Sequence, residues 1–147
     1  MLPLNPWEHY FPTKALYSFC MEPVCRKHGI TRTELDILLF LANNPQYDTA
    51  AAIVEVRCLA KSHVSTSLKA LEQSGFLKKH YLPGNKKTAH LTICGRADTL
   101  IADGRQAQEQ FFQVMFDGLT SEEITRMRTC FSRIQENIKQ YLEVHGL

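Results

Sequence analysis

The chain has 147 residues, of which 44% are hydrophobic and 22% are charged. This length suffices for one well-packed domain, and no apolar run approaches the roughly 18 residues that a membrane helix needs. The beginning of the sequence lacks the basic end and apolar run of a signal peptide, so we expect a single compact domain in the cytoplasm with no membrane association.

The charge is distributed unevenly along the chain. Although the net charge is +2, the segment from Arg57 to Lys87 contains seven basic residues and one acid, Glu72, which leaves −4 for the remainder. A basic segment on an otherwise acidic protein is typical of a polyanion-binding protein, because each neutralised phosphate releases counterions.

The first third of the chain is predicted to be helical after a short arm. Three prolines among aromatic residues indicate an extended arm over residues 1–12, and apolar spacing predicts a helix from Thr13 to about His28, kinked at Pro23. The pattern Thr31-x-x-Glu34 is a capping box that begins the next helix, and Asn43-Asn44-Pro45 ends it.

Two further helices are predicted in the basic segment and just before it. Asp48 or Thr49 caps a short helix over residues 50–57, and Ser62 is the expected N-cap of a helix that ends at Gly75. Segments 76–81 and 88–93 are predicted strands joined by the turn residues 83–85, which makes a β-hairpin with basic residues near its tip.

The last third is predicted to consist of two helices. One runs from Gly95 to about Phe116, and a second capping box, Thr120-Ser121-Glu122-Glu123, begins the other. Apolar residues in that last helix alternate spacings of three and four, which is typical of a coiled-coil contact with another helix. This predicted dimerisation seam consists of Ile124, Met127, Phe131, Ile134, Ile138 and Tyr141.

The order of elements predicts a mainly α fold with a small β-hairpin. Three helices, a tight turn, a further helix and a basic hairpin outline a winged helix-turn-helix lobe, over residues 31–94, that binds DNA. With Val64, Leu68 and Leu71 packed inward, the opposite face of the 62–75 helix presents hydroxyl and lysine side chains to the major groove. Expected DNA-binding residues are Arg57, Lys61, Ser62, His63, Ser65, Thr66, Lys69, Lys78, Lys79, Asn85, Lys86 and Lys87.

The sequence resembles the MarR family of bacterial transcription regulators over about residues 31–97. The resemblance is carried by Gly29-Ile30-Thr31-x-x-Glu34-Leu35-x-Ile37-Leu38, by Leu59-Ala60-Lys61-Ser62-His63-Val64-Ser65-x-x-Leu68-x-x-Leu71-Glu72-x-x-Gly75-Phe76-Leu77, and by Leu91-Thr92-x-x-Gly95. It implies a homodimeric, ligand- or signal-responsive repressor that binds a pseudo-palindromic operator in double-stranded DNA.

The resemblance also assigns roles to the flanking regions. Residues 1–30 and 95–147 are expected to interlock in the dimer, with Trp7, Tyr10 and Phe11 of the arm joining the seam. A small aromatic or lipophilic effector is expected near Tyr17, Phe19 and Phe111.

Two positions depart from the family pattern. Family members carry Asp-x-Arg in the wing, with the arginine in the minor groove, whereas this chain has Pro83 and Asn85 at those places. The position in the turn that glycine often occupies is Cys58.

Two alternative functions remain open. Cys20 and Cys25 lie where some family members sense oxidants, although they are about 140° apart around a helix and cannot easily bridge each other. Such a redox-sensing regulator would use a sulfenic acid or a partner chain. The other alternative is a helical protein-interaction module that uses the seam. No cofactor, metal site or catalytic residue is expected, because histidines and cysteines are scattered and catalytic motifs are missing.

Overall fold

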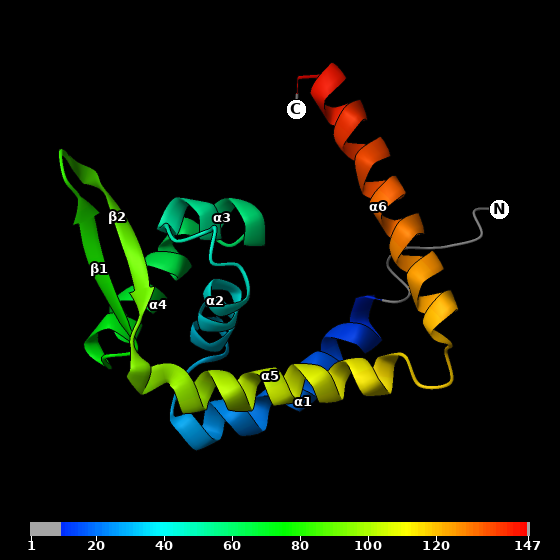
Figure 1. Ribbon diagram of the computed structural model, residues 1–147, viewed down its shortest axis with the longest axis horizontal. Coiled ribbons are helices and arrows are strands. Elements are labelled where there is room, and N and C mark those ends of the chain that lie inside the picture. Colours follow the sequence, from blue (N-terminus) through cyan, green and yellow to red (C-terminus); the bar gives the residue numbers. More distant parts are fainter. Residues whose placement is uncertain (1–9, 147) are drawn as a thin grey trace. The chain divides into compact units, whose positions relative to one another are not determined.

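The computed structural model describes residues 10–146 and is mainly helical (Figure 1). Along the described chain the elements are α1 (Tyr10–His28), α2 (Arg32–Asn43), α3 (Ala50–Arg57), α4 (Lys61–Gln73), β1 (Leu77–Leu82), β2 (Asn85–Ile93), the short 3-10 helix η1 (Gly95–Ala97), α5 (Asp98–Met115) and α6 (Ser121–Val144). The predicted fold class, a helical chain with one antiparallel hairpin, is confirmed.

The chain divides into two compact units, with the boundary between Phe111 and Phe112 near the end of α5. The first unit contains the hairpin and the helices that pack on it, and α6 lies in the second. The predicted functional division at residues 30 and 94 stays a prediction. Among residues 10–146, no helix combines the length and the hydrophobicity that crossing a bilayer requires.

Helix α1 begins earlier than predicted. It starts at Tyr10 rather than Thr13, because Pro12 lies in the first turn, where its missing N–H group costs no hydrogen bond. Its C-terminal half buries Met21, Val24 and Cys25, whereas Phe19 is 74% exposed. The arm residue Trp7 and the side chain of Tyr10 lie outside the described part of the structure.

Helix α2 forms the centre of the first unit. The predicted capping box at its start is present, since the Glu34 N–H group donates to Thr31 Oγ1 and the Thr31 N–H group donates to the Glu34 carboxylate. Leu35 and Leu39 are buried against α5, where Gly104 lets the two helices approach closely. The core of the unit therefore joins the helix-turn-helix to α5.

A left-handed residue separates α3 from α4. Thr49 caps α3 through its hydroxyl, and Cys58 ends the helix with φ = 50° and ψ = 39°. This conformation favours glycine, because a Cβ atom crowds the following carbonyl oxygen. Cys58 is the only non-glycine residue with positive φ among residues 10–146.

The prediction that Ser62 caps α4 is wrong. The helix begins at Lys61, its N-cap is Ala60, and no side-chain hydrogen bond caps this start in the described structure. Ser62 lies inside the first turn instead. The left-handed residue at Cys58 lets the chain turn within residues 58–60, so α4 begins earlier than the position expected from a serine N-cap.

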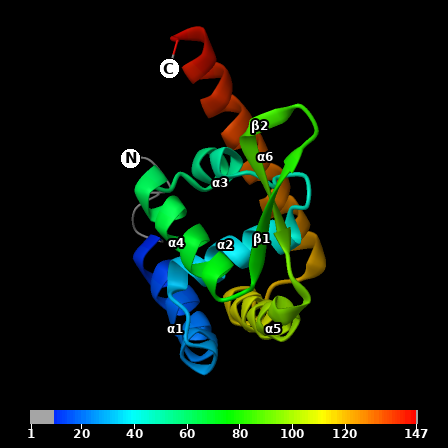
Figure 2. The same ribbon diagram turned by 90° about the vertical axis from the view of Figure 1, so that its left-hand side faces the viewer.

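The hairpin is longer than predicted and is attached at its base. β1 and β2 pair antiparallel with His80 opposite His90, and the register shifts between Tyr81 and Leu82. Near its base the hairpin gains one more partner, because Thr49 forms an isolated bridge with His90. As Figure 2 shows, the two strands rise beside α3 and α4.

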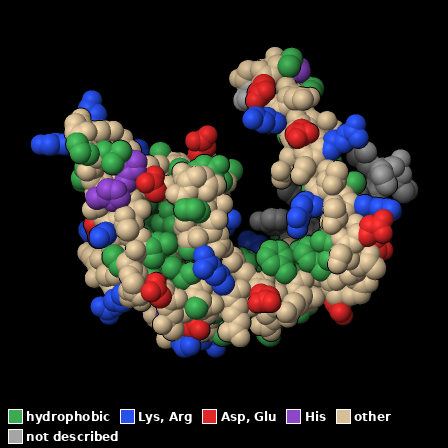
Figure 3. All heavy atoms as spheres, in the orientation of Figure 1, with side chains coloured by type: hydrophobic (Ala, Val, Ile, Leu, Met, Phe, Trp, Pro, Cys, Tyr) green, Lys and Arg blue, Asp and Glu red, His purple; other side chains and the backbone are tan. Residues whose placement is uncertain are grey.

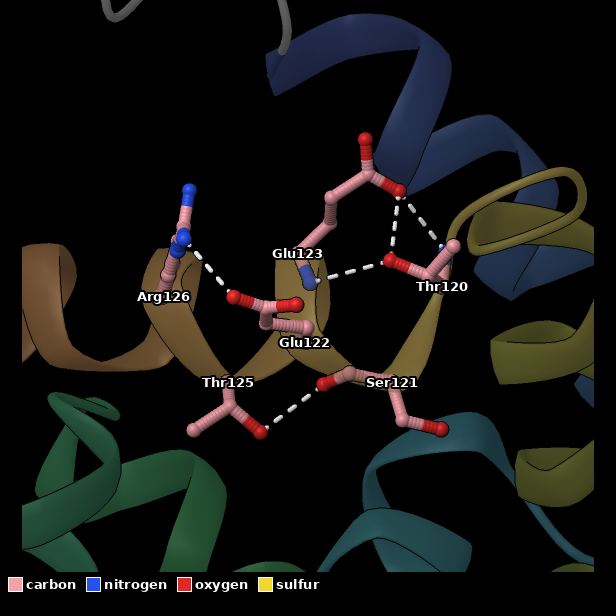
Figure 4. Close-up of polar contacts among 6 residues, drawn as sticks. All are labelled: Thr120, Ser121, Glu122, Glu123, Thr125 and Arg126. Atoms are coloured by element: carbon pink, nitrogen blue, oxygen red, sulfur yellow. Dashed lines mark hydrogen bonds and ion pairs between the residues drawn. The ribbon is translucent and has the colours of Figure 1, made fainter.

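Helix α6 begins with the second predicted capping box. The Glu123 N–H group donates to Thr120 Oγ1, the Glu123 carboxylate accepts from the Thr120 N–H group and hydroxyl, and Arg126 pairs with Glu122 one turn on (Figure 4). None of the 24 residues of α6 is buried.

Candidate nucleic-acid interface

Helix α4 separates apolar and polar side chains as predicted. Val64, Leu68 and Leu71 are buried at 3% exposure or less, and Ser67, which the sequence pattern did not single out, is buried beside them. The residues predicted to read DNA on this helix all lie exposed: Ser62, His63, Ser65, Thr66 and Lys69. Their hydroxyl, imidazole and ammonium groups suit base edges and phosphates.

The start of α4 is also available to an anion. Because no side chain caps it in the described structure, the first N–H groups of the helix lack the hydroxyl or carboxylate partner that most helices supply. Arg57 and Lys61, on either side of the turn, are both exposed. A phosphate placed here would accept from backbone amides and face positive charge.

The four hairpin lysines lie on two different faces. Lys79 and Lys87 line a groove of about 640 Å³ that also includes Lys61 and Ser65 of α4. Since side chains alternate along a strand, Lys78 points to the other face of the hairpin. Basic side chains are visible at the hairpin tip in Figure 3. The groove thus brings together three of the predicted phosphate-binding lysines.

Lys79 has a partner within the chain. Its Nζ atom lies 2.9 Å from Oε2 of Glu72 on α4, and both side chains are about one third to two fifths exposed, at 34% and 41%. The ion pair connects β1 to α4 and offsets part of the charge on Lys79. Lys61 and Lys87 therefore offer more net positive charge to a phosphate in this groove.

The side chain of Asn85 also makes hydrogen bonds within the hairpin. Its Oδ1 atom accepts from the N–H groups of Lys87 and Thr88, at 3.0 and 3.2 Å. This Asx-type turn holds the tip in shape and leaves the amide nitrogen of Asn85 for any contact with DNA.

The contact that fixes the base of the hairpin was not predicted. Asp48 Oδ2 lies 2.8 Å from His90 Nδ1, and the Leu91 N–H group donates to the Asp48 carbonyl oxygen at 2.7 Å. Forty-two residues separate Asp48 from His90. No local pattern signals such a pair, because only the folded hairpin brings it together.

The three predicted effector-pocket residues are not gathered at one place. Tyr17 and Phe111 meet edge to face with ring centroids 5.1 Å apart, and Arg32 lies over the Tyr17 ring at 4.3 Å. Gln108 donates to the Tyr17 hydroxyl at 3.3 Å. Phe19 is exposed, because two residues along α1 turn it well away from Tyr17.

The two candidate redox cysteines are buried. Cys20 and Cys25 are 5% and 7% exposed, and burial raises the pKa of the Cys25 thiol even though the nearby charge of Arg32 opposes this rise. A raised pKa reduces the thiolate that oxidants attack, so within one chain Cys25 is a small core residue. No cluster of three or more potential metal ligands occurs among residues 10–146.

The predicted seam is solvent-exposed over most of its length in the single chain. Phe131, Ile134, Ile138 and Tyr141 are between 46% and 63% exposed, whereas Ile124 and Met127 are half-buried.

Comparison with known proteins identifies the lobe. A sequence model of the MarR family matches residues 28–86, the segment from the end of α1 to the hairpin tip. No curated protein matches the sequence significantly.

Solved structures share the fold over nearly the whole chain. A Listeria monocytogenes protein assigned to the MarR family and complexed with 26mer DNA aligns with a TM-score of 0.83 and 20% identity, covering 99% of this chain and 96% of that one. Staphylococcus aureus MarR in complex with salicylate and kanamycin gives 0.73 and 19%, over 91% and 90% of the two chains. The S. aureus MepR–DNA complex gives 0.73 and 14%, over 92% and 96%.

The family match falls on the helix-turn-helix and hairpin whose geometry is described above, and the structural likeness extends to the flanking helices. The chain therefore has the winged helix fold of the MarR structures that it resembles, and its residues 28–86 match the sequence model of that family.

Proposed function

We propose that the protein is a sequence-specific, DNA-binding transcription regulator that works as a homodimer in the cytoplasm and carries out no catalysis. The observation that carries this proposal is the exposed polar face of α4, which lies beside a groove lined by Lys61, Lys79 and Lys87. Two structurally similar proteins, from L. monocytogenes and S. aureus, are found in complexes with DNA, which supports the same partner.

The roles follow from side-chain chemistry. Ser62, His63, Ser65, Thr66 and Lys69 read bases in the major groove, since they carry hydrogen-bonding groups on the outward face of α4. Arg57, Lys61, Lys86 and Lys87 neutralise phosphates, and Lys78 adds charge from the other face of the hairpin.

Dimerisation is supported by the side chains of α6. A helix of 24 residues that buries none of them, yet carries an apolar stripe at coiled-coil spacing, gains stability when the stripe packs on another helix. A second copy of the chain would also place two α4 helices on the halves of a pseudo-palindromic site.

The proposal includes a small aromatic effector. The S. aureus MarR structure holds salicylate, a small aromatic acid, which supports an aromatic effector in this chain as well. Phe19 would join Tyr17 and Phe111 around an effector only through the partner chain, because in one chain it is turned away from them.

The experiment that tests the function is selection of duplexes from a random library with the purified protein, followed by titration of the selected duplex at several salt concentrations. We expect a strongly negative dependence of affinity on salt and two half-sites about one helical turn apart. Thr66→Ala should weaken binding to the selected duplex more than to random DNA, and Lys87→Ala should weaken both alike.

The exposed seam also supports a second candidate, a helical module that binds another protein through α6. This candidate predicts no enrichment of any duplex and little salt dependence.

Equal losses on both DNAs for Thr66→Ala would contradict the assignment of base reading to α4.

A further inference from the structure

The base of the hairpin is joined to the helix-turn-helix by contacts that converge on two residues. Asp48, just before the α3 N-cap Thr49, accepts the Leu91 N–H group through its carbonyl oxygen and contacts His90 Nδ1 through its carboxylate. Thr49 adds the isolated bridge to His90. Backbone and side-chain contacts of Asp48 and Thr49 thus attach β2 to the start of α3.

This pair is partly shielded from solvent. The side chain of His90 is 19% exposed and that of Asp48 is 42% exposed. With Nδ1 protonated, the imidazole donates to the carboxylate whether it is neutral or cationic, so the hydrogen bond exists in both states. A second proton, on Nε2, converts that hydrogen bond into an ion pair and strengthens it.

The surroundings contain one further histidine and several charges. His80 lies directly opposite His90 on β1, with ring centroids 5.7 Å apart, and its Nδ1 atom is 3.2 Å from Thr92 Oγ1. Figure 3 shows histidine side chains on the hairpin next to an acidic side chain. The other charged groups on the neighbouring elements are Lys78 and Lys79 of β1, Lys86 and Lys87 of β2, Glu55 and Arg57 of α3, Arg32, Glu34 and Asp36 of α2, and Lys61, His63, Lys69 and Glu72 of α4.

Three of the four acidic neighbours, Glu34, Asp36 and Glu72, already have partners. Arg32 bonds Asp36, Glu34 caps α2 and Glu72 pairs with Lys79. Asp48 is the acid that contacts the His90 ring. The response of this junction to a proton on His90 is therefore set first by the attraction of Asp48, with the opposing His80 as a weaker repulsion when it too is charged.

We propose that His90 is a positioning residue for the wing, held by Asp48, and that its protonation attaches the hairpin more tightly to the helix-turn-helix. Histidine changes its charge between about pH 5 and 8, and carboxylates remain ionised over most of that range. Attachment of the wing, and with it DNA binding, therefore strengthens as the pH falls. The DNA part of this statement rests on the proposed function, whereas the attachment itself does not.

The Leu91 N–H group reports the attachment without DNA. We would measure its hydrogen-exchange protection by NMR in the full chain at about pH 5.5 and 8, relative to the Leu38 amide in α2. We expect the relative protection to rise about two- to fivefold at the lower pH, which is the size of a partly exposed ion pair.

Asp48→Asn keeps the backbone acceptor and removes the charge, so it should abolish this rise, and His90→Gln should do the same. Glu72→Gln removes the ion pair between β1 and α4, so it should lower protection equally at both pH values. His145→Gln at the end of α6 should behave as the original chain. The proposal is overturned if the relative protection of the Leu91 amide in the original chain is the same at both pH values. It is also overturned if Asp48→Asn shows the same rise in protection as the original chain.

Anisotropy titrations with the selected duplex test the consequence for DNA. Lowering the pH should increase the DNA affinity of the original chain by a larger factor than that of Asp48→Asn. Protonation of His63 contributes equally to both proteins, so the difference between the two factors reports the His90–Asp48 contact. If no duplex is bound at either pH, the proposed function fails while the exchange result still decides the wing contact. If DNA is bound and the exchange ratio is one, the proposed function stands and this inference fails.

Discussion

Gly104 of α5 lies directly against Leu39 of α2: a Cβ atom on Gly104 would stand 2.8 Å from Cδ2 and 3.0 Å from Cδ1 of Leu39, and 3.2 Å from Cδ1 of Leu35. Both leucines are fully buried, so neither can move aside freely. This close approach explains a glycine in the middle of a helix, where it lowers helix propensity.

We therefore expect Gly104→Ala to destabilise the fold by about 1 to 2 kcal/mol, because overpacking exceeds the gain in helix propensity. Urea unfolding measures the change. Gly95→Ala is the control, since its nearest neighbour would be Asp98 Oδ2 at an ordinary 3.7 Å. An increase in stability for Gly104→Ala would contradict the packing described for α2 and α5.

Cys58→Gly should raise the free energy of unfolding by about 0.5 to 1 kcal/mol, because it relieves a left-handed conformation that a Cβ atom disfavours. Cys58→Ala retains the Cβ atom and should change stability little. Thermal unfolding of the three proteins makes the comparison, and equal values for the Gly and Ala variants would refute the strain.

The two groove lysines should differ in their contribution to DNA binding. Lys87→Ala should reduce the magnitude of the salt slope by about 0.9, the effect of one phosphate contact, whereas Lys79→Ala should reduce it less because Glu72 already pairs with Lys79. Equal slopes for the two alanine variants would show that the ion pair does not persist on DNA.

Stability at acid pH should depend on Asp103. Hydrogen bonds from Lys27 and then His28, at 2.7 and 2.6 Å, hold the pKa of the Asp103 carboxyl below its ordinary value. A depressed folded-state pKa stabilises the protein above the unfolded-state pKa, and this stabilisation disappears as the pH falls through the folded-state value.

Asp103→Asn should therefore lower stability at neutral pH and make the loss of stability below about pH 4 less steep. Urea unfolding at a series of pH values measures both effects. Glu109→Gln on the exposed side of α5 is the matched control. If stability falls equally steeply at acid pH in Asp103→Asn and in the original chain, the assignment is contradicted.

The oligomeric state should depend on the seam of α6. Ile138→Glu places a charge in the proposed helix-helix contact, so it should convert a dimer into monomers at micromolar concentration in sedimentation experiments. Gln140→Glu, on the opposite side of the helix, should leave the dimer intact. A dimer that survives Ile138→Glu would move the interface away from this stripe.

Local rules predicted the local features of this fold. The capping boxes at Thr31 and Thr120 and the break at Gly75 depend on residues within four positions of one another, and each is present. The start of α4 was misplaced, because the hydroxyl of Ser62 is a strong local capping signal, whereas the left-handed backbone at Cys58 is indicated only by the glycine that the family often has at this position.

Contacts between distant segments could not be predicted in the same way. Asp48 with His90 and Glu72 with Lys79 meet only after the hairpin folds onto α3 and α4, so the sequence showed Lys79 as a free phosphate ligand. The side chain of Asn85 was a different case, since its bonds to residues two and three positions on are a recognisable turn pattern.

The uncapped beginning of α4 has a thermodynamic consequence. Among the described residues no side chain caps the first amides of this helix, so in the proposed complex a DNA phosphate would accept from them at the turn that carries Ser62 and His63. Part of the binding energy is then spent on ordering that turn. Complex formation should therefore show a more favourable enthalpy and a less favourable entropy than rigid docking. Ala60→Ser and Ala60→Asp supply a capping side chain, so they should reduce both of these differences.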